Sequence, residues 1–133
     1  MSPLLTSSIE SLRPGDLQGF FEGWPRPPTP EQHLELLRRS DERLLAVEAG
    51  GEVVGFITAL TDGVLAAYIP LLEVRREWRG RGIGTLLARA MLERLDHYYM
   101  VDVVCDGDVL PFYERLGLER WTAAIRRRRH ARP

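Results

Sequence analysis

The sequence contains no lysine: all 18 basic residues are arginine, and 19 acidic residues leave a net charge of −1. A nearly neutral chain has no overall field that would draw it to nucleic acid or to a membrane surface, so neither is expected as a partner. The single cysteine, Cys105, excludes an intrachain disulfide and a cysteine-rich zinc site. The three histidines (His33, His97 and His130) lie far apart and lack metal-ligand spacing. We therefore expect no bound metal.

Long apolar runs are also missing. No segment is long enough to cross a bilayer, and the first residues lack a charged stretch followed by an apolar run. A chain of 133 residues with 44% hydrophobic residues can bury one core. We expect a single cytoplasmic domain over residues 1–133, with a frayed arginine-rich tail from about residue 126 to 133. The run Arg126–Arg129 is interpreted as a solvated strand end, with nucleic-acid contact as the alternative.

Hydrophobic periodicity and turn residues predict strands and helices in the order β-α-α-β-β-β-α-β-α-β. Thr29 is expected to cap a helix that begins at Pro30, and Asp16 to cap a shorter one. The expected fold class is α/β (α+β), a layered domain around a mostly antiparallel sheet. The predicted strands are Leu4–Leu12, Arg43–Glu48, Val53–Leu60, Leu65–Val74, Tyr98–Cys105 and Glu119–Arg127, and the predicted helices are Asp16–Phe21, Pro30–Arg39, Ile83–Leu95 and Asp108–Leu116.

An arginine- and glycine-rich segment stands directly before one of these helices. Four arginines and three glycines lie between Arg75 and Gly84. A helix N-terminus carries partial positive charge and normally attracts acidic residues, so arginines there indicate a bound anion. Glycines allow close backbone approach, and arginines bind phosphate bidentately. A P-loop would need lysine, and a dinucleotide fingerprint would need glycine where Thr85 stands. The segment predicts a phosphate site of another kind.

Two motifs resemble the GNAT superfamily of N-acetyltransferases. The segment Arg79–Gly84 is similar to the family's Arg/Gln-x-x-Gly-x-Gly/Ala signature, and Pro111–Leu118 is similar to its late Phe-Tyr-x-x-x-Gly-Phe segment. The resemblance covers about residues 43 to 121. It implies a mixed, mostly antiparallel central sheet flanked by helices, with two strands splayed to admit CoA.

The resemblance also implies acetyl-CoA as the cosubstrate. The segment from Arg79 to Thr85 would hold its pyrophosphate, and the backbone from Leu72 to Val74 would pair with its pantetheine arm as an added strand. Asp106 stands where the family commonly has asparagine, so the resemblance implies a contact with CoA there through an acidic side chain instead of an amide. The implied cofactor-binding residues are Leu72, Glu73, Val74, Arg79, Gly80, Arg81, Gly82, Ile83, Gly84, Thr85 and Asp106.

Tyr113 matches the family's tyrosine that protonates the departing CoA thiolate, whereas without the resemblance it would be a core residue. The family's glutamate base would lie near Tyr68, where this chain has no carboxylate. Tyr68 is therefore expected beside the substrate. Glu73 is a second catalytic candidate, because a carboxylate in an apolar strand is costly to bury. An edge glutamate paired with an arginine is the alternative interpretation.

The acceptor is expected to be an amine on a small molecule or a peptide. Glu22 and Trp24 fall where the family's substrate loop lies, so Glu22 could attract a cationic amine and Trp24 could stack over it. The alternative for Trp24 is ordinary packing. The expected function is acetyl transfer by direct attack in a ternary complex, and a homodimer is possible by family likeness. A catalytically silent acyl-CoA-binding sensor or partner-binding domain is the alternative function.

Overall fold

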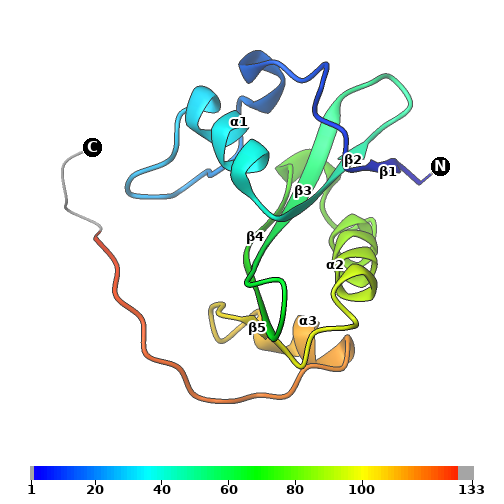
Figure 1. The fold of residues 1–133 in the computed structure, drawn as a ribbon. Helices are drawn as coiled ribbons and strands as arrows, with labels where there is room; N and C mark the ends of the chain where they lie inside the picture. The colour runs from blue at the N-terminus through cyan, green and yellow to red at the C-terminus, as the bar shows by residue number, and fades with distance from the viewer. Residues whose placement is uncertain (1, 129–133) are drawn as a thin grey trace.

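The computed structural model describes residues 2–128 (Figure 1). These residues form five strands, three α-helices and two short 3₁₀-helices, and three of the strands follow one another directly along the chain. The strands are β1 (Leu4–Thr6), β2 (Glu42–Val47), β3 (Val53–Thr61), β4 (Ala66–Val74) and β5 (Met100–Val103); the helices are η1 (Pro14–Leu17), α1 (Pro30–Arg39), η2 (Arg76–Trp78), α2 (Ile83–Arg94) and α3 (Leu110–Arg115).

The strands form one sheet in the order β1-β2-β3-β4-β5. The first four are antiparallel neighbours, and β5 runs parallel to β4. The sheet is thus mixed and mostly antiparallel, as the sequence predicts. The β3–β4 register shifts between Thr58 and Leu60. This bulge inserts one extra residue into β4, so Ile69 and Leu72 pack into the same core although an odd number of positions separates them.

Helices cover both faces of the sheet (Figure 1). One face packs against α2, whose fully buried Leu87 and Met91 meet Ile57 of β3. On the other face, η1 and α1 enclose a second core around Phe56 and Leu37. The first turn of α1 is capped as expected, because Thr29 Oγ1 accepts the N–H of Gln32 at 3.1 Å.

The strands β4 and β5 separate after a short paired stretch. Pairing runs from Ala66 with Met100 to Ile69 with Val103, whereas β4 continues to Val74. Pro70 follows the last pair and has no N–H to donate to a ladder. The second half of β4 therefore has an edge that β5 does not cover. The splay expected between these strands is confirmed.

Two predictions near the N-terminus are wrong in extent or type. The first strand is confined to Leu4–Thr6 instead of reaching Leu12. The helix expected from Asp16 to Phe21 is replaced by the 3₁₀-helix η1. Asp16 lies in the last part of that turn, and its carboxylate accepts the Arg13 N–H at 2.9 Å. Capping therefore occurs, but one turn earlier than predicted. The last helix is also shorter than predicted, at Leu110–Arg115.

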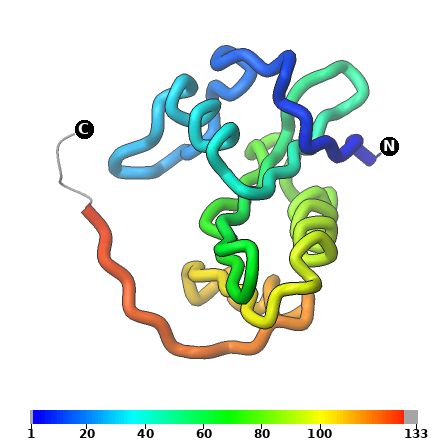
Figure 2. Tube along the Cα trace, viewed as in Figure 1, coloured from blue at the N-terminus to red at the C-terminus, as the bar shows by residue number. Residues whose placement is uncertain are grey.

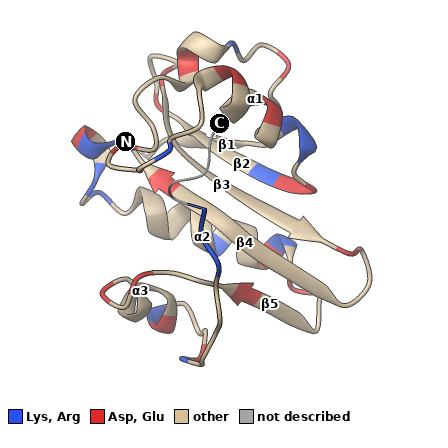
Figure 3. Cartoon of the chain, turned by 90° about the vertical axis from the view of Figure 1, so that its left-hand side faces the viewer, with Lys and Arg blue, Asp and Glu red and all other residues tan. Residues whose placement is uncertain are grey.

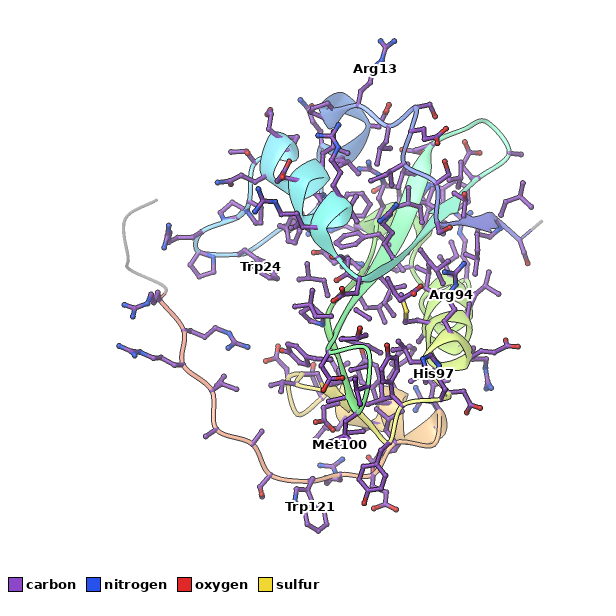
Figure 4. All side chains as sticks on the ribbon, viewed as in Figure 1. Arg13, Trp24, Arg94, His97, Met100 and Trp121 are labelled. Carbon is purple, nitrogen blue, oxygen red and sulfur yellow. The ribbon has the colours of Figure 1, made fainter. Side chains whose placement is uncertain are left out.

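The predicted strand Glu119–Arg127 is wrong. Residues 118–128 form no helix or strand and run away from β5 along the outside of the molecule (Figure 2). Trp121 is 85% exposed and projects from this segment (Figure 4). The residues of this segment have high β-propensity. A strand must also pair with the edge of a sheet, and residues 118–128 pair with none. The expected tail over residues 126–133 lies partly outside the described residues.

Candidate active site

The glycine-rich segment forms a tight turn at the start of α2, which is called the α2 turn below. Gly82 caps the helix with a φ of 80°, in the left-handed region that favours glycine. The first helical hydrogen bond runs from the Leu86 N–H to the Gly82 carbonyl at 3.0 Å. The N–H groups of residues 83–85 therefore have no acceptor within the helix, and its first turn holds no acidic side chain. An anion can bind these N–H groups directly.

Two arginines flank this turn and stay at the surface. Arg79 donates from Nε to the Val74 carbonyl at 2.9 Å, which anchors the turn to the end of β4. Arg81 stacks over Trp78, with its guanidinium carbon 4.6 Å from the ring centroid. Both side chains keep further N–H donors, because a guanidinium carries five. They can add phosphate contacts to those of the backbone.

The other two arginines of the segment bind the protein instead. Arg75 donates to the carbonyls of Val53 at 2.6 Å, Gln18 at 2.5 Å and Asp16 at 2.9 Å. Its side chain is only 12% exposed and lies over the Phe20 ring at 4.3 Å. Arg76 makes an ion pair with Glu22. These two arginines hold residues 16–22 in place. The sequence alone does not distinguish this structural role from the binding of an anion.

The three glycines of the turn differ in backbone conformation. Gly80, like Gly82, has a positive φ, of 77°. Gly84 has no such φ, and a Cβ there would lie 3.8 Å from Val74 and 3.9 Å from Phe112, which is ordinary contact. The turn therefore packs against the end of β4 and against α3. Val74 lies two positions after Leu72 on β4, and Phe112 directly precedes Tyr113 on α3.

A cavity of about 790 Å³ occupies the gap between β4 and β5. Its walls come from the second half of β4, the chain after β5, α3, the loop before α1 and the C-terminal segment. The residues that line it are Gly23, Trp24, Pro25, Arg26, Ile69, Pro70, Leu72, Val103, Val104, Cys105, Asp106, Val109, Tyr113, Ile125, Arg127 and Arg128.

Tyr113 belongs to this wall and is 7% exposed. Burial, with a smaller contribution from Cys105, raises the pKa of its hydroxyl to about 12. The phenol therefore keeps its proton throughout the neutral range. Burial also raises the pKa of Cys105, with Asp106 as the next cause. A protonated hydroxyl in a largely apolar wall can donate a hydrogen bond to a developing negative charge.

Glu73 is not part of the cavity wall. Its Oε1 accepts the Phe21 N–H at 2.8 Å, and its Oε2 is buried without a partner among the described residues. Burial raises the pKa of this carboxyl, against the lowering effects of the Phe21 N–H and of Arg79. Phe21 itself has a φ of 64°, which is unusual for a bulky residue. The carboxylate thus holds a strained backbone position in the loop before Trp24.

The structure brings some of the predicted acceptor residues together and leaves others apart. Trp24 lines the cavity, is 47% exposed and packs edge-on against Phe21 at 5.0 Å. Glu22 is bound to Arg76 outside the wall. Tyr68 lies between the buried Ala67 and Ile69, so its side chain faces the opposite side of the sheet from theirs. Asp106 lines the cavity and is exposed.

Sequence reasoning missed the basic part of the wall. Arg26, Arg127 and Arg128 line the cavity, although the sequence indicated only a solvated arginine run. Their approach depends on the course of the C-terminal segment, which no periodicity encodes. Between residues 2 and 128, no group of three or more His, Cys, Asp or Glu side chains is arranged to hold a metal ion. Within the same range, no helix has the length and apolarity to cross a membrane.

Comparison with known proteins places this geometry in a family. Residues 9–118 match the family model described as "Acetyltransferase (GNAT) family". A candidate acetyltransferase from Deinococcus radiodurans R1 is 50% identical in sequence, with a TM-score of 0.92 over 96% of this chain and 90% of that one. A GNAT family acetyltransferase from Streptococcus pneumoniae TIGR4 shares the fold at 22% identity, with a TM-score of 0.74 over 96% of this chain and 97% of that one.

A curated relative aligns with part of the chain. N-alpha-acetyltransferase 30 from Schizosaccharomyces pombe is 34% identical over 67 residues. That alignment covers 47% of this chain and 45% of the yeast protein, so the chain matches less than half of the relative's length.

Proposed function

The chain belongs to the acetyltransferase (GNAT) family, and from this we propose that it transfers acetyl from acetyl-CoA to a primary amine by direct attack in a ternary complex. One observation carries the proposal. The α2 turn packs against Val74 and Phe112, and the cavity wall contains Leu72, on the same strand as Val74, and Tyr113, which follows Phe112. A turn suited to phosphate thus lies beside a gap between strands whose wall includes a protonated tyrosine, and this arrangement supports the proposal.

The chain's own groups fit acetyl-CoA. The N–H groups of residues 83–85 and the side chains of Arg79 and Arg81 would hold the pyrophosphate, with Gly80 and Gly82 giving the turn its shape. The edge of β4 from Leu72 to Val74 is left open by β5 and would pair with the amides of the pantetheine arm. Asp106, exposed on the cavity wall, is the remaining candidate contact.

Bound acetyl-CoA supplies a thioester whose carbonyl carbon the amine attacks. The new C–N bond forms and the C–S bond breaks. The amine nitrogen gives up one proton to water, and the departing thiolate is left to accept a proton or a hydrogen bond. Tyr113 retains its proton because burial raises the pKa of its hydroxyl to about 12. We assign to Tyr113 the stabilisation of the departing thiolate by this hydroxyl.

The acceptor amine must be neutral to attack. Deprotonation at pH 7 costs an alkyl amine with a pKa near 10.4 about 4.6 kcal/mol, whereas it costs an α-amino group with a pKa near 8 about 1.4 kcal/mol. Asp106 is the one carboxylate in the described cavity wall, and it is exposed. This shortage of bases favours an α-amino acceptor. The name of the yeast relative, an N-alpha-acetyltransferase, supports the same choice.

A direct assay tests the proposal. Purified protein with acetyl-CoA and a panel of α-amino and alkyl amines should release CoA and form the acetylated amine, as measured by thiol titration and mass spectrometry. Turnover should be highest for α-amines. Tight acetyl-CoA binding without acetyl transfer to any amine in the panel would favour the silent-sensor alternative.

A further inference from the structure

Two segments distant in sequence meet at one side of the cavity. The loop Gly23–Arg26 precedes α1, and residues 125–128 belong to the C-terminal segment. Arg26 donates from Nη1 to the Arg128 carbonyl at 3.3 Å, which ties the segments together. Both lie on the α1 side of the sheet, away from α2 (Figure 1), and the C-terminal segment passes in front of β4 in the turned view (Figure 3). This side of the cavity is therefore separate from the turn that begins α2.

The charge on this side is concentrated and positive. Arg127 and Arg128 line the cavity, and neither forms an ion pair with a carboxylate among residues 2–128. Arg26 also lines this wall, and Asp106 is the one carboxylate residue among the described lining residues. The whole chain has a net charge of −1, so composition alone does not produce this imbalance. The wall is built to meet negative charge.

A positive wall has two consequences for an amine substrate. Nearby like charge disfavours the ammonium form, so it lowers the pKa of the amine and raises the fraction able to attack. The same charge repels a purely cationic acceptor and attracts one that carries a carboxylate, which guanidinium groups bind bidentately. Trp24, half-exposed on the same wall, offers an apolar surface beside these groups.

We propose that the acceptor carries a carboxylate within one or two residues of its α-amino group, and that Arg127 and Arg128 select it. This inference rests on the proposed acetyl transfer and specifies its substrate class. A free acidic amino acid and a peptide with acidic second and third residues share this chemistry. Acceptors with cationic groups near the amine are excluded by the same charge.

The test compares three peptides with the same first residue, whose second and third residues are both glutamate, both glutamine or both lysine. Free glutamate is the fourth acceptor and distinguishes the two sources. We expect kcat/KM for the glutamate peptide or free glutamate to exceed that for the lysine peptide at least tenfold, and the ratio to shrink as ionic strength rises. Equal kcat/KM for all acceptors would overturn the inference.

Charge-reversal variants locate the effect. The double variant Arg127→Glu/Arg128→Glu should lose or invert the preference. The matched control Arg13→Glu/Arg89→Glu makes the same change of net charge at exposed positions, of which Arg13 points into solvent (Figure 4). The control should keep the preference for the glutamate peptide. If the Arg127→Glu/Arg128→Glu variant also keeps that preference, the inference is overturned.

A binding measurement separates the two proposals if no acceptor is acetylated. Calorimetry with the CoA-bound protein would then compare the glutamate and lysine peptides directly. Tenfold tighter binding of the glutamate peptide, lost in the double variant, supports the arginine wall even where acetyl transfer fails. Equal binding contradicts it.

Discussion

The Oε1 atom of Glu73 accepts a hydrogen bond of 2.8 Å from the backbone N–H of Phe21. The bond joins the end of β4, where the open edge lies, to the loop that leads to Trp24. Arg75, two positions further on, binds the carbonyls of Asp16 and Gln18 in the same loop. The strand expected to hold the cofactor thus also fixes one wall of the acceptor side. The position of Glu73 suits holding this loop better than removing a proton from a substrate.

Substitution of Glu73 distinguishes these two roles. Glu73→Gln keeps an oxygen that can accept the Phe21 N–H, so we expect kcat to fall by less than about threefold, with the pH profile unchanged. Glu73→Ala leaves the N–H without its partner and should destabilise the fold by about 1–2 kcal/mol while raising the KM for the amine. If Glu73 is the base, Glu73→Gln should instead lose about 100-fold in kcat or more.

Arg75 and Arg76 provide a matched pair for stability. Arg75 is nearly buried and makes three hydrogen bonds to carbonyls, so Arg75→Gln should lower the free energy of unfolding by about 3 kcal/mol. Arg76→Gln removes an exposed ion pair with Glu22 and should cost less than about 1 kcal/mol. Urea denaturation of both variants measures the difference. Equal losses would mean that Arg75 does not hold the loop.

The local signals in the sequence predicted most of the fold. The cap at Thr29, the glycine turn before α2 and the apolar strands predicted α1, α2 and the central strands with small errors at their ends. The strand predicted at residues 119–127 was wrong although these residues have high β-propensity. A strand also needs a partner edge, which local sequence does not encode. The splay of β4 and β5 followed from the family resemblance alone.

The candidate site was only partly predictable, for a related reason. Tyr113 and the α2 turn lie in continuous motifs, so their neighbours in sequence identify them. The contacts of Glu73 with Phe21 and of Arg75 with Gln18 join residues 52 and 57 positions apart. No pattern in either segment encodes them. Arg127 reaches the cavity through the path of the chain rather than through a motif.

The effect of a glycine substitution on CoA binding can be separated from its effect on stability. Gly82→Ala and Gly63→Ala each force a Cβ into a similar positive φ, of 80° and 77°, with no neighbouring atom within 4 Å. Both should lose about 1 kcal/mol of stability. We expect Gly82→Ala, but not Gly63→Ala, also to weaken CoA binding several-fold by isothermal titration. Arg79→Ala should weaken it further, and full affinity in all three variants would contradict the phosphate assignment.

Removal of a single hydroxyl tests the role of Tyr113. Tyr113→Phe should lower kcat by about 10- to 100-fold, because the departing thiolate loses its hydrogen-bond donor. The dissociation constant of CoA should change less than twofold. Tyr99→Phe removes a hydroxyl from a side chain that is 85% exposed and should leave both quantities unchanged. An unaltered kcat in Tyr113→Phe would exclude the assigned role.

His33 gives the fold a dependence on pH that can be isolated. The side chain is 1% exposed among Phe20, Phe21 and Phe56, and neither ring nitrogen has a partner among the described residues. Burial, followed by the charge of Arg75, lowers its pKa from 6.5 to about 4. Between these values the unfolded chain binds a proton that the folded chain does not, so stability falls as pH drops from about 6.5 towards 4.

A variant without the imidazole separates this effect from the titration of carboxylates. The lowered pKa corresponds to about 3 kcal/mol of folding stability. This contribution is fully present above the pKa of the unfolded chain and is lost below the pKa of the folded protein. His33→Leu removes the titration and keeps an apolar side chain, so its stability relative to wild type should rise by about that amount between pH 7 and pH 4. Urea denaturation at half-unit steps measures the difference. A constant difference across this range would mean that His33 does not titrate with a lowered pKa in the folded protein.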